Sequence, residues 1–391
     1  MTDKKINTVL QKIKDGYILP LFSPVALCLI ELASCETSCV DDLADLIEKD
    51  PSLAVRTLGL ANAAIFGNVE PITTIKDAAM KIGFNQLRIM ALAISLRDTF
   101  PMGKVGLMDY EKFWLASLYR AIIAKGLTKA SGNRNPEEAF VAGLTLEIGL
   151  LIMFDLFIKG KIDFMPEPYP LETLLAWEKE HFGVDHRKIG ELALRYWKFP
   201  ETLLECQKIH LNEERRAKLH PLALLCDTAR RFSYLLSEKA AAWHIMFTET
   251  ETTYGINSSV LTPLLVSALE EVQELSGSLK VEMSRERDLI QLLEKAEYTL
   301  QKLTNTIAEW THFVFQGQGP DRSESTSPLI RYSLAEKLQI VAVEIKKPLS
   351  IMREFIDYLI PVVSPDSSEW CYVQAFSEQV KKVELEVSLF F

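Results

Sequence analysis

The stretch Phe140-Val-Ala-Gly-Leu-Thr-Leu-Glu-Ile-Gly-Leu-Leu151 contains a single charged residue, Glu147. Apolar side chains recur through it at helical spacing, which predicts an apolar-faced helix over residues 136–158. Such a helix needs other helices to cover it, so the stretch favours a compact all-α bundle. Glu147 lies between Leu146 and Ile148, and we expect its carboxylate to face solvent or to form a local salt bridge, because ionised side chains are rarely buried.

The same periodicity extends along the chain in both directions, and residues typical of helix ends interrupt it. Asp50-Pro51 predicts the start of one helix, with Asp50 as the N-cap and Pro51 in the first turn. Thr74 and Asp77 resemble a capping box that opens a short helix ending at Gly83. No run of alternating strand residues is convincing, and further helices are expected over residues 38–49, 84–98, 110–131, 170–181, 185–196, 199–211 and 219–236.

The composition is that of a globular protein large enough for two or three domains. The chain has 391 residues, of which 48% are hydrophobic and 25% charged, and its formal net charge is −10. An acidic total argues against broad binding to nucleic acid, because contact with the phosphate backbone needs a basic face. The first residues are not followed by an apolar signal-peptide core, and the longest uncharged stretch, residues 17–30, is too short for a bilayer. We therefore expect no membrane span.

Six cysteines are scattered through the chain at Cys28, Cys35, Cys39, Cys206, Cys226 and Cys371. Cys35 and Cys39 are spaced for one helical face, but no second Cys or Cys/His pair completes a four-ligand site. We expect buried or incidental reduced thiols, which suit a cytoplasmic protein, and no cofactor.

The pattern changes after residue 262, where a long apolar seam begins. Two glutamates, Glu282 and Glu286, interrupt this seam, which runs through Leu265, Ala268, Val272, Leu275, Leu279, Leu289, Leu293, Ala296, Leu300, Leu303, Ile307 and Trp310. It predicts a coiled coil, the alternative being a long helix that packs on its own domain. Residues 317–328 are rich in Gly, Ser and Pro, which is typical of a flexible linker. The expected organisation is a helical domain over 1–262, a connector over 263–316, the linker, and a helical hairpin over 329–391.

The first part of the chain resembles the HDOD domain, a relative of the HD hydrolases found in bacterial signalling proteins. The resemblance extends from about Leu19 to about Leu275 and rests on the order of several short motifs. These are Leu19-Pro-Leu-Phe-Ser-Pro-Val-Ala-Leu27, Ile47-Glu-Lys-Asp-Pro-Ser-Leu53, Leu60-Ala-Asn-Ala-Ala-Ile-Phe-Gly67, Ile82-Gly-Phe-Asn-Gln-Leu-Arg88, Phe113-Trp114, Glu138-Ala-Phe-Val-Ala-Gly-Leu144, Phe182-Gly-Val-Asp-His186 and Trp197-Lys-Phe-Pro200. The resemblance implies an HD-like helical bundle.

The resemblance also implies where catalytic metal ligands would stand in an active HD enzyme. Leu146-Glu147 occupies the place of the His-Asp pair, and a leucine side chain has no lone pair to donate to a cation. Ala116 stands where another ligand histidine is expected, and Leu211 where a second histidine often follows. The remaining pocket candidates are Glu147, His186, His210 and Asp227. Without the central pair, we expect no catalytic metal site.

Each remaining candidate also has a structural interpretation. We expect His186 and His210 to be hydrogen-bonded structural histidines, and Asp227 to pair with Arg230 or Arg231 on the same helix. Asn62 and Arg88 are interpreted as polar groups at helix-packing positions or on the surface, and no binding role is assigned to either.

A second resemblance concerns the segment Val343-Glu-Ile-Lys-Lys-Pro-Leu-Ser-Ile351, which is similar to the dimerisation helix of sensor histidine kinases. Val343 stands at the phosphoacceptor position and cannot accept a phosphoryl group. Pro348 is expected inside a helix over 332–359, followed by a turn with Pro361 and a second helix from Ser367 to about Leu389. No Gly-rich nucleotide-binding segment follows, so we expect no kinase activity. The alternative is a generic helical hairpin.

Three functions are compared on this basis. The preferred one is a non-enzymatic, cytoplasmic signalling module that binds a protein partner or a small ligand and forms a homodimer through its C-terminal helices. The alternative is a metal-dependent phosphohydrolase acting on a nucleotide or cyclic dinucleotide. A nucleic-acid-binding regulator is the least favoured because of the acidic total charge.

Overall fold

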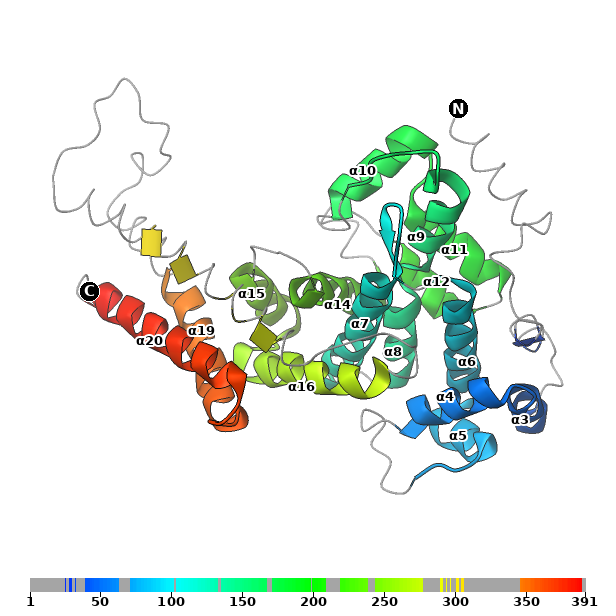
Figure 1. The fold of residues 1–391 in the computed structure, drawn as a ribbon, viewed down its shortest axis with the longest axis horizontal. Helices are drawn as coiled ribbons and strands as arrows, with labels where there is room; N and C mark the ends of the chain where they lie inside the picture. The colour runs from blue at the N-terminus through cyan, green and yellow to red at the C-terminus, as the bar shows by residue number, and fades with distance from the viewer. Residues whose placement is uncertain are drawn as a thin grey trace. The chain divides into compact units, whose positions relative to one another are not determined.

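The computed structural model describes residues 39–62, 71–101, 103–132, 135–166, 171–197, 199–208, 219–237, 243–276 and 345–388, with single positions within 25–32 and 289–305. Helices dominate these residues, so the predicted all-α fold class is confirmed. The chain divides into two compact units, Met1–Ser237 with Ser267–Ser284 and Glu238–Val266 with Arg285–Phe391. The domain limits expected at 262, 316 and 328 stay predictions, and the expected linker lies outside the described residues (Figure 1).

Two of the first described helices begin at the capping residues that the sequence predicts. Asp50 accepts a hydrogen bond from the backbone N–H of Leu53 at 3.1 Å, and Thr74 accepts one from that of Asp77 at 3.0 Å. Gly83 has a φ of 102°, which only glycine adopts without strain, and it separates two helices that would otherwise be continuous. The helices between Val40 and Thr99 are α3 (Val40–Glu48), α4 (Pro51–Asn62), α5 (Ile75–Ile82) and α6 (Phe84–Thr99).

A tight group of three helices forms the core of the first unit. Helix α7 (Tyr110–Ala130) packs against both α8 (Pro136–Thr145) and α14 (Pro221–Ser237). A Cβ on Gly143 would lie 2.8 Å from backbone atoms of Arg120 and Ala121, so α8 approaches the main chain of α7 closely. A two-residue hairpin that the sequence did not predict, β1 (Lys104–Val105) with β2 (Met108–Asp109), precedes α7.

The prediction of a single helix over residues 136–158 is wrong in one respect, because the helix is interrupted at Leu146 and Glu147. Helix α8 ends at Thr145, α9 covers Ile148–Met153, and a π-helical turn, η2, follows over Phe154–Ile158. Glu147 has φ −103° and ψ 14°, outside the helical region. The break falls at the one charged residue of the stretch.

The segment Glu138–Ile158 is apolar and long enough to cross a membrane, with a mean hydropathy of 2.1. Within the protein 89% of that window is buried. This burial is typical of a core helix, which passes the same test of length and composition.

Helix α9 crosses α11 (His186–Tyr196) with the two backbones in contact. A Cβ on Gly149 would lie 2.5 Å from the backbone nitrogen of Gly190 and would collide with the carbonyl oxygen of His186. Only a residue without a side chain fits at this crossing. Two further helices, α10 (Leu171–Phe182) and α12 (Glu201–Gln207), flank α11 in sequence, and residues 209–218 lie outside the described part of the chain.

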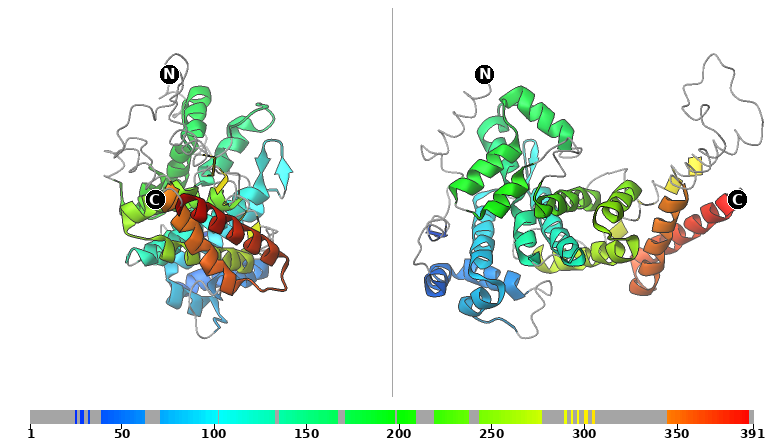
Figure 2. Two further views of the ribbon diagram at one scale, coloured as in Figure 1. Left: turned by 90° about the vertical axis from the view of Figure 1, so that its left-hand side faces the viewer. Right: turned by 180° about the vertical axis from the view of Figure 1, so that it is seen from behind.

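The second unit contains a helical hairpin formed by α19 (Lys347–Val362) and α20 (Ser368–Ser388), which lie side by side (Figure 2). The expectation for Pro361 is corrected, because Pro361 lies inside α19 near its end rather than in the turn. Pro348 lies near the start of α19, after Lys346, whose backbone is also helical, and residues 332–344 of the expected helix lie outside the described residues.

Two contacts attach the hairpin to other helices of the second unit. Lys347 forms an ion pair of 2.8 Å with Glu251 of α15 (Trp243–Tyr254). Glu354 accepts a hydrogen bond from Ser258, the first residue of α16 (Ser258–Ser276). The first part of α16, up to Val266, belongs to this unit, and the rest belongs to the first unit.

Much of the apolar seam is buried within this single chain. The described seam residues Leu265, Ala268, Val272, Leu275, Leu289, Leu293, Ala296 and Leu300 are all buried. At these positions the chain itself covers the seam, as expected for a helix that packs on its own protein. Glu282, Glu286 and Trp310 lie outside the described residues, and the coiled coil stays a prediction.

Candidate functional site

The carboxylate of Glu147 is fully buried at the break between α8 and α9. Its Oε1 accepts a hydrogen bond from Nη1 of Arg187 at 2.9 Å, and its Oε2 lies 3.2 Å from Nε2 of His186. Both cationic residues belong to the first turn of α11, about forty residues further along the chain. The expectation that Glu147 faces solvent or forms a local salt bridge is therefore wrong, because its partners are distant in sequence and the whole group lies in the core.

His186 lies between two carboxylates. Its Nδ1 is 2.8 Å from both oxygens of Glu178, a buried residue of α10, and its backbone N–H donates to Glu178 at 2.9 Å. An imidazole that faces an acceptor at each ring nitrogen favours the doubly protonated form, which donates from both. His186 is therefore buried and hydrogen-bonded, and the hydrogen bonding agrees with the prediction.

Glu147, Glu178, His186 and Arg187 stabilise one another's ionised forms. Burial alone lowers the pKa of His186, but the negative charges of Glu178 and Glu147 outweigh it and raise that pKa to about 9. Burial alone raises the pKa of Glu147, but His186 and Arg187 outweigh it and hold the pKa well below its usual range. Both ions are therefore stable at neutral pH.

Arg187 connects the helix break to a third segment. Its Nη1 also donates to the carbonyl of Leu146 at 3.0 Å, and its Nη2 donates to the carbonyl of Cys206 in α12 at 3.2 Å. One buried guanidinium thus binds the carboxylate of Glu147 and satisfies two backbone acceptors. Such a planar donor group is well suited to joining several acceptors at once.

Two more buried arginines surround this group. Arg120 of α7 donates from Nε to the carbonyl of Gly143 at 2.7 Å and from Nη2 to Ser117 at 2.8 Å. Burial lowers the pKa of Arg120. Arg230 of α14 lies 3.3 Å from Asp227, which confirms one of the two pairings expected for that aspartate. Burial lowers the pKa of Arg230, but Asp227 and Glu147 outweigh it and the pKa is raised. We call Glu147, Glu178, His186, Arg187, Arg120, Arg230 and Asp227 the charge cluster.

The donor atoms of the charge cluster do not fit a catalytic metal ion. Leu146 is buried and offers only carbon, and Ala116 offers a methyl group. Each oxygen of Glu147 and each nitrogen of His186 already faces a charged side chain of the protein. Within the described ranges, no group of three His, Cys, Asp or Glu residues is placed to hold a metal. His210 and Leu211 lie outside those ranges.

Asn62 and Arg88 both have packing roles. Asn62 exchanges two hydrogen bonds with the backbone of Ile72, at 2.7 and 2.6 Å, and so joins the end of α4 to the segment that precedes α5. Arg88 is buried, donates to the carbonyl of Leu29 at 3.2 Å and lies over the ring of Phe199. Burial lowers the pKa of Arg88 to about 10.

The sequence did not single out Glu178, Arg187 or Arg120. A clue existed for Glu178, which follows the buried Leu174 and Leu175 at helical spacing and therefore lies on the apolar face of α10. Arg187 stands in a run of three polar residues after Asp185, and nothing in that run marks which one is buried.

These elements define an all-α domain with a charge cluster in its core. The chain contains an HDOD domain, since the family model of the HDOD domain matches residues 19–213. The match begins where the sequence predicted and ends before the expected limit near Leu275. The resemblance of residues 343–351 to a kinase dimerisation helix stays a prediction.

Several solved structures are similar to the chain. One, from Shewanella amazonensis SB2B and provisionally assigned as a phosphohydrolase, is 25% identical, with 69% of this chain and 97% of that chain covered and a TM-score of 0.49. An HDOD domain protein of unknown function from Geobacter sulfurreducens is 20% identical, with coverage of 69% and 97% and a TM-score of 0.45. The MmoQ response regulator from Methylococcus capsulatus str. Bath is 28% identical, with coverage of 63% and 97% and a TM-score of 0.36. No curated protein matches the chain.

The charge cluster predicts a large difference between two arginines of α11. Arg187→Met should lower the free energy of unfolding of the first unit by about 3–5 kcal/mol, because Glu147 would remain ionised in the core without its donor. Arg195→Met is the matched control, since Arg195 is 52% exposed and pairs with Glu191 and Glu201 at the surface. Its loss should cost less than about 1 kcal/mol. Urea unfolding followed by circular dichroism measures both, and equal losses would contradict the prediction.

Proposed function

We propose that this chain is a non-catalytic bacterial regulatory protein that acts in the cytoplasm by binding a protein partner or a small ligand. The presence of an HDOD domain supports a regulatory role. One observation favours the non-catalytic form of that role: the carboxylate of Glu147 is neutralised by His186 and Arg187, which are both parts of the protein.

Electrostatics supports this proposal. A divalent cation that approached Glu147 would meet the positive charges of His186 and Arg187 within about one hydrogen-bond length of the carboxylate oxygens. In a buried site like charges at that distance repel strongly. Metal binding would require both internal cations to move away or, for His186, to lose a proton. Hydrolysis would also require an open coordination position, and the neighbouring Leu146 contributes no ligand atom.

The total charge of the protein favours a protein or a small ligand over nucleic acid as the bound molecule. The chain has a formal net charge of −10, which opposes close approach of a phosphate backbone. Binding without bond cleavage requires a defined surface and no activated water.

The alternative, a metal-dependent phosphohydrolase, makes an opposite prediction that is simple to test. The full chain would be purified without chelators from cells supplied with Mn, Fe and Zn, and its metal content measured by mass spectrometry. We expect less than about 0.1 equivalent of any transition metal, since a true site retains its metal through purification. We also expect no Mn-dependent turnover of bis-p-nitrophenyl phosphate or cyclic dinucleotides.

Glu147→Gln is the control variant for this experiment. It removes the carboxylate charge while keeping the side-chain shape. Activity that belongs to this chain should change in the variant, whereas activity from a contaminating enzyme should not. One equivalent of metal, together with turnover that Glu147→Gln abolishes, would overturn the proposed function.

We also propose that the chain forms a homodimer through its C-terminal helices. Three apolar side chains of the hairpin remain exposed near its turn: Ile360 at 37%, Val362 at 41% and Tyr372 at 45%. Two such hairpins can cover these side chains by packing as a four-helix bundle, the usual symmetric arrangement.

Sedimentation equilibrium of the full chain tests the dimer. We expect a dimer at about 10 µM and a monomer when Val362→Glu and Tyr372→Glu are combined, because burying two carboxylates in an apolar interface is costly. Val55→Glu is the control, since Val55 is 70% exposed and lies on α4, outside the hairpin. A monomeric natural chain at about 100 µM would refute the proposed dimer.

A further inference from the structure

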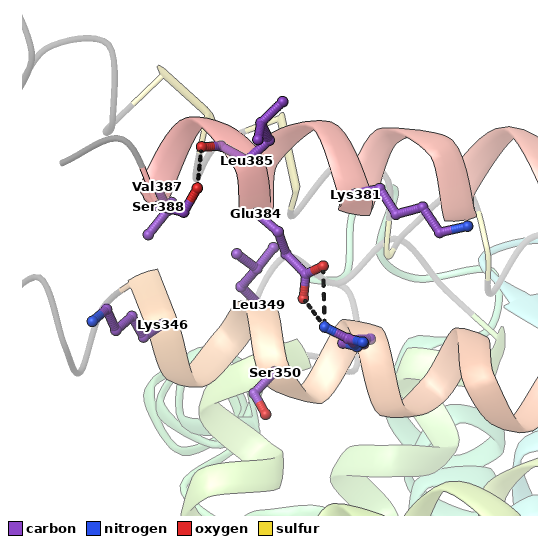
Figure 3. A pocket seen from close by; sticks show the side chains of 9 residues that line it. Lys346, Leu349, Ser350, Lys381, Glu384, Leu385, Val387 and Ser388 are labelled. Carbon is purple, nitrogen blue, oxygen red and sulfur yellow. Dashed lines mark hydrogen bonds and ion pairs between the residues drawn. The ribbon is translucent and has the colours of Figure 1, made fainter. Parts of the chain in front are cut away.

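His186 and Glu147 of the charge cluster have no direct route to solvent, because both side chains are fully buried. A surface hollow of about 680 Å³ lies between α19 and α20, and none of its lining residues belongs to the charge cluster (Figure 3). Arg353 in that hollow already pairs with Glu384 at 3.2 Å and with Asp357 at 3.6 Å. A ligand of the first unit would therefore reach His186 only if an element that covers it moved.

Helix α10 covers His186 with the thickness of a single helix. Glu178, on the inner face of α10, is fully buried and lies 2.8 Å from Nδ1 of His186. The next two residues, Lys179 and Glu180, are exposed on the outer face. On this side of the first unit, α10 alone therefore separates the imidazole from solvent.

The position of α10 favours its movement as one piece. It lies at the edge of the first unit (Figure 1). No other described helix packs along α10 over as many residues as α9 and α12 pack along α11. Its apolar contact with the core is made by one stripe of buried leucines, Leu171, Leu174 and Leu175. A peripheral helix with a narrow contact is the kind of element that opens locally in a folded protein.

One carboxylate fastens α10 to α11. Both oxygens of Glu178 lie 2.8 Å from Nδ1 of His186, and one of them accepts a hydrogen bond from the backbone N–H of His186 at 2.9 Å. That N–H is at the start of α11, where backbone donors have no partner within the helix. The ion pair of 2.8 Å between Lys179 and Asp185 adds little, because Lys179 is 58% exposed. The contact of Glu178 is therefore the main polar attachment of α10.

The pivot is the short connection between α10 and α11. Helix α10 ends at Phe182, and Gly183 follows with a φ of 73°, which glycine adopts without strain. Phe182 stacks on Phe157 of η2 with ring centroids 5.4 Å apart, so this contact lies beside the pivot. Asp185 caps α11 separately by accepting the backbone N–H of Lys188 at 2.8 Å. Rotation about Gly183 would thus carry Glu178 away from His186 and leave the start of α11 intact.

We propose that α10 is a lid, closed by the contact between Glu178 and His186, that opens about Gly183 while the rest of the first unit stays folded. Opening uncovers the imidazole of His186 and, through it, the charge cluster. The inference rests on the proposed function and names how access of a small ligand to this part of the protein is controlled.

Hydrogen exchange of the full chain, followed by mass spectrometry of its peptides at pH 7.5, tests the lid. The amides of α10 should exchange at least about 100-fold faster than those of α7 and α14, because local opening requires less free energy than global unfolding. Up to about 1 M urea, exchange of α10 should change much less than exchange of α7 and α14, because opening of the lid exposes little surface.

Three variants separate local from global opening. Glu178→Gln should accelerate exchange of α10 by about tenfold or more, because the closed state loses a charge-assisted hydrogen bond. Glu180→Gln is the matched control, exposed on the same helix, and its effect should stay within about twofold. Ile123→Val, in the buried core of α7, should accelerate exchange of α7 and α14 by about two- to tenfold and leave α10 unchanged.

Three outcomes would overturn the lid. They are exchange of α10 that matches α7 and α14 in rate and in urea dependence, acceleration of α10 by Ile123→Val, and no response of α10 to Glu178→Gln. These measurements need neither a ligand nor a metal. Failure of the lid is therefore distinguishable from failure of the proposed function, which the metal and turnover measurements test.

Discussion

The core of this protein depends on an ion pair that the chain makes with itself. An ionised carboxylate in a protein interior is costly unless charged partners and hydrogen bonds surround it. Glu147 has both, with Arg187 at 2.9 Å and His186 at 3.2 Å. His186 in turn forms an ion pair with Glu178. Each charged side chain of this group therefore lies next to one of opposite charge.

The backbone geometry follows from the same contacts. The carboxylate of Glu147 lies at the break between α8 and α9 and meets the first turn of α11, and Arg187 also donates to the carbonyl of Leu146 at that break. Gly149 lets α9 pass directly over the backbone of α11, which keeps His186 and Arg187 within reach. The helix break, the close crossing and the charge cluster therefore lie next to one another in the first unit.

Much of this fold could be predicted from the sequence, because the evidence for helices is local. The caps at Asp50 and Thr74 and the stop at Gly83 lie within a few residues of the helices they bound. The burial of Glu147 was not predictable in this way, since its partners are distant in sequence and the local pattern of Leu146 and Ile148 says nothing about them. The candidate residues Glu147, His186 and Asp227, chosen from the sequence, only partly lie together in the structure. Its first two members meet in the core, whereas Asp227 faces Arg230 on its own helix.

The charge on His186 is the most direct test of whether internal cations occupy the place of a metal. Imidazole ¹⁵N chemical shifts of the full chain, labelled at histidine, would be recorded from pH 6 to pH 10 and assigned with His186→Gln. Both ring nitrogens should be protonated at pH 7.5 and should titrate near pH 9. Because the folded pKa is raised above the unfolded value of about 6.5, the stability that His186 contributes is complete below pH 6.5 and is lost as the pH rises through about 9. A neutral ring at pH 7.5, titrating at or below about 6.5, would contradict the internal ion pair.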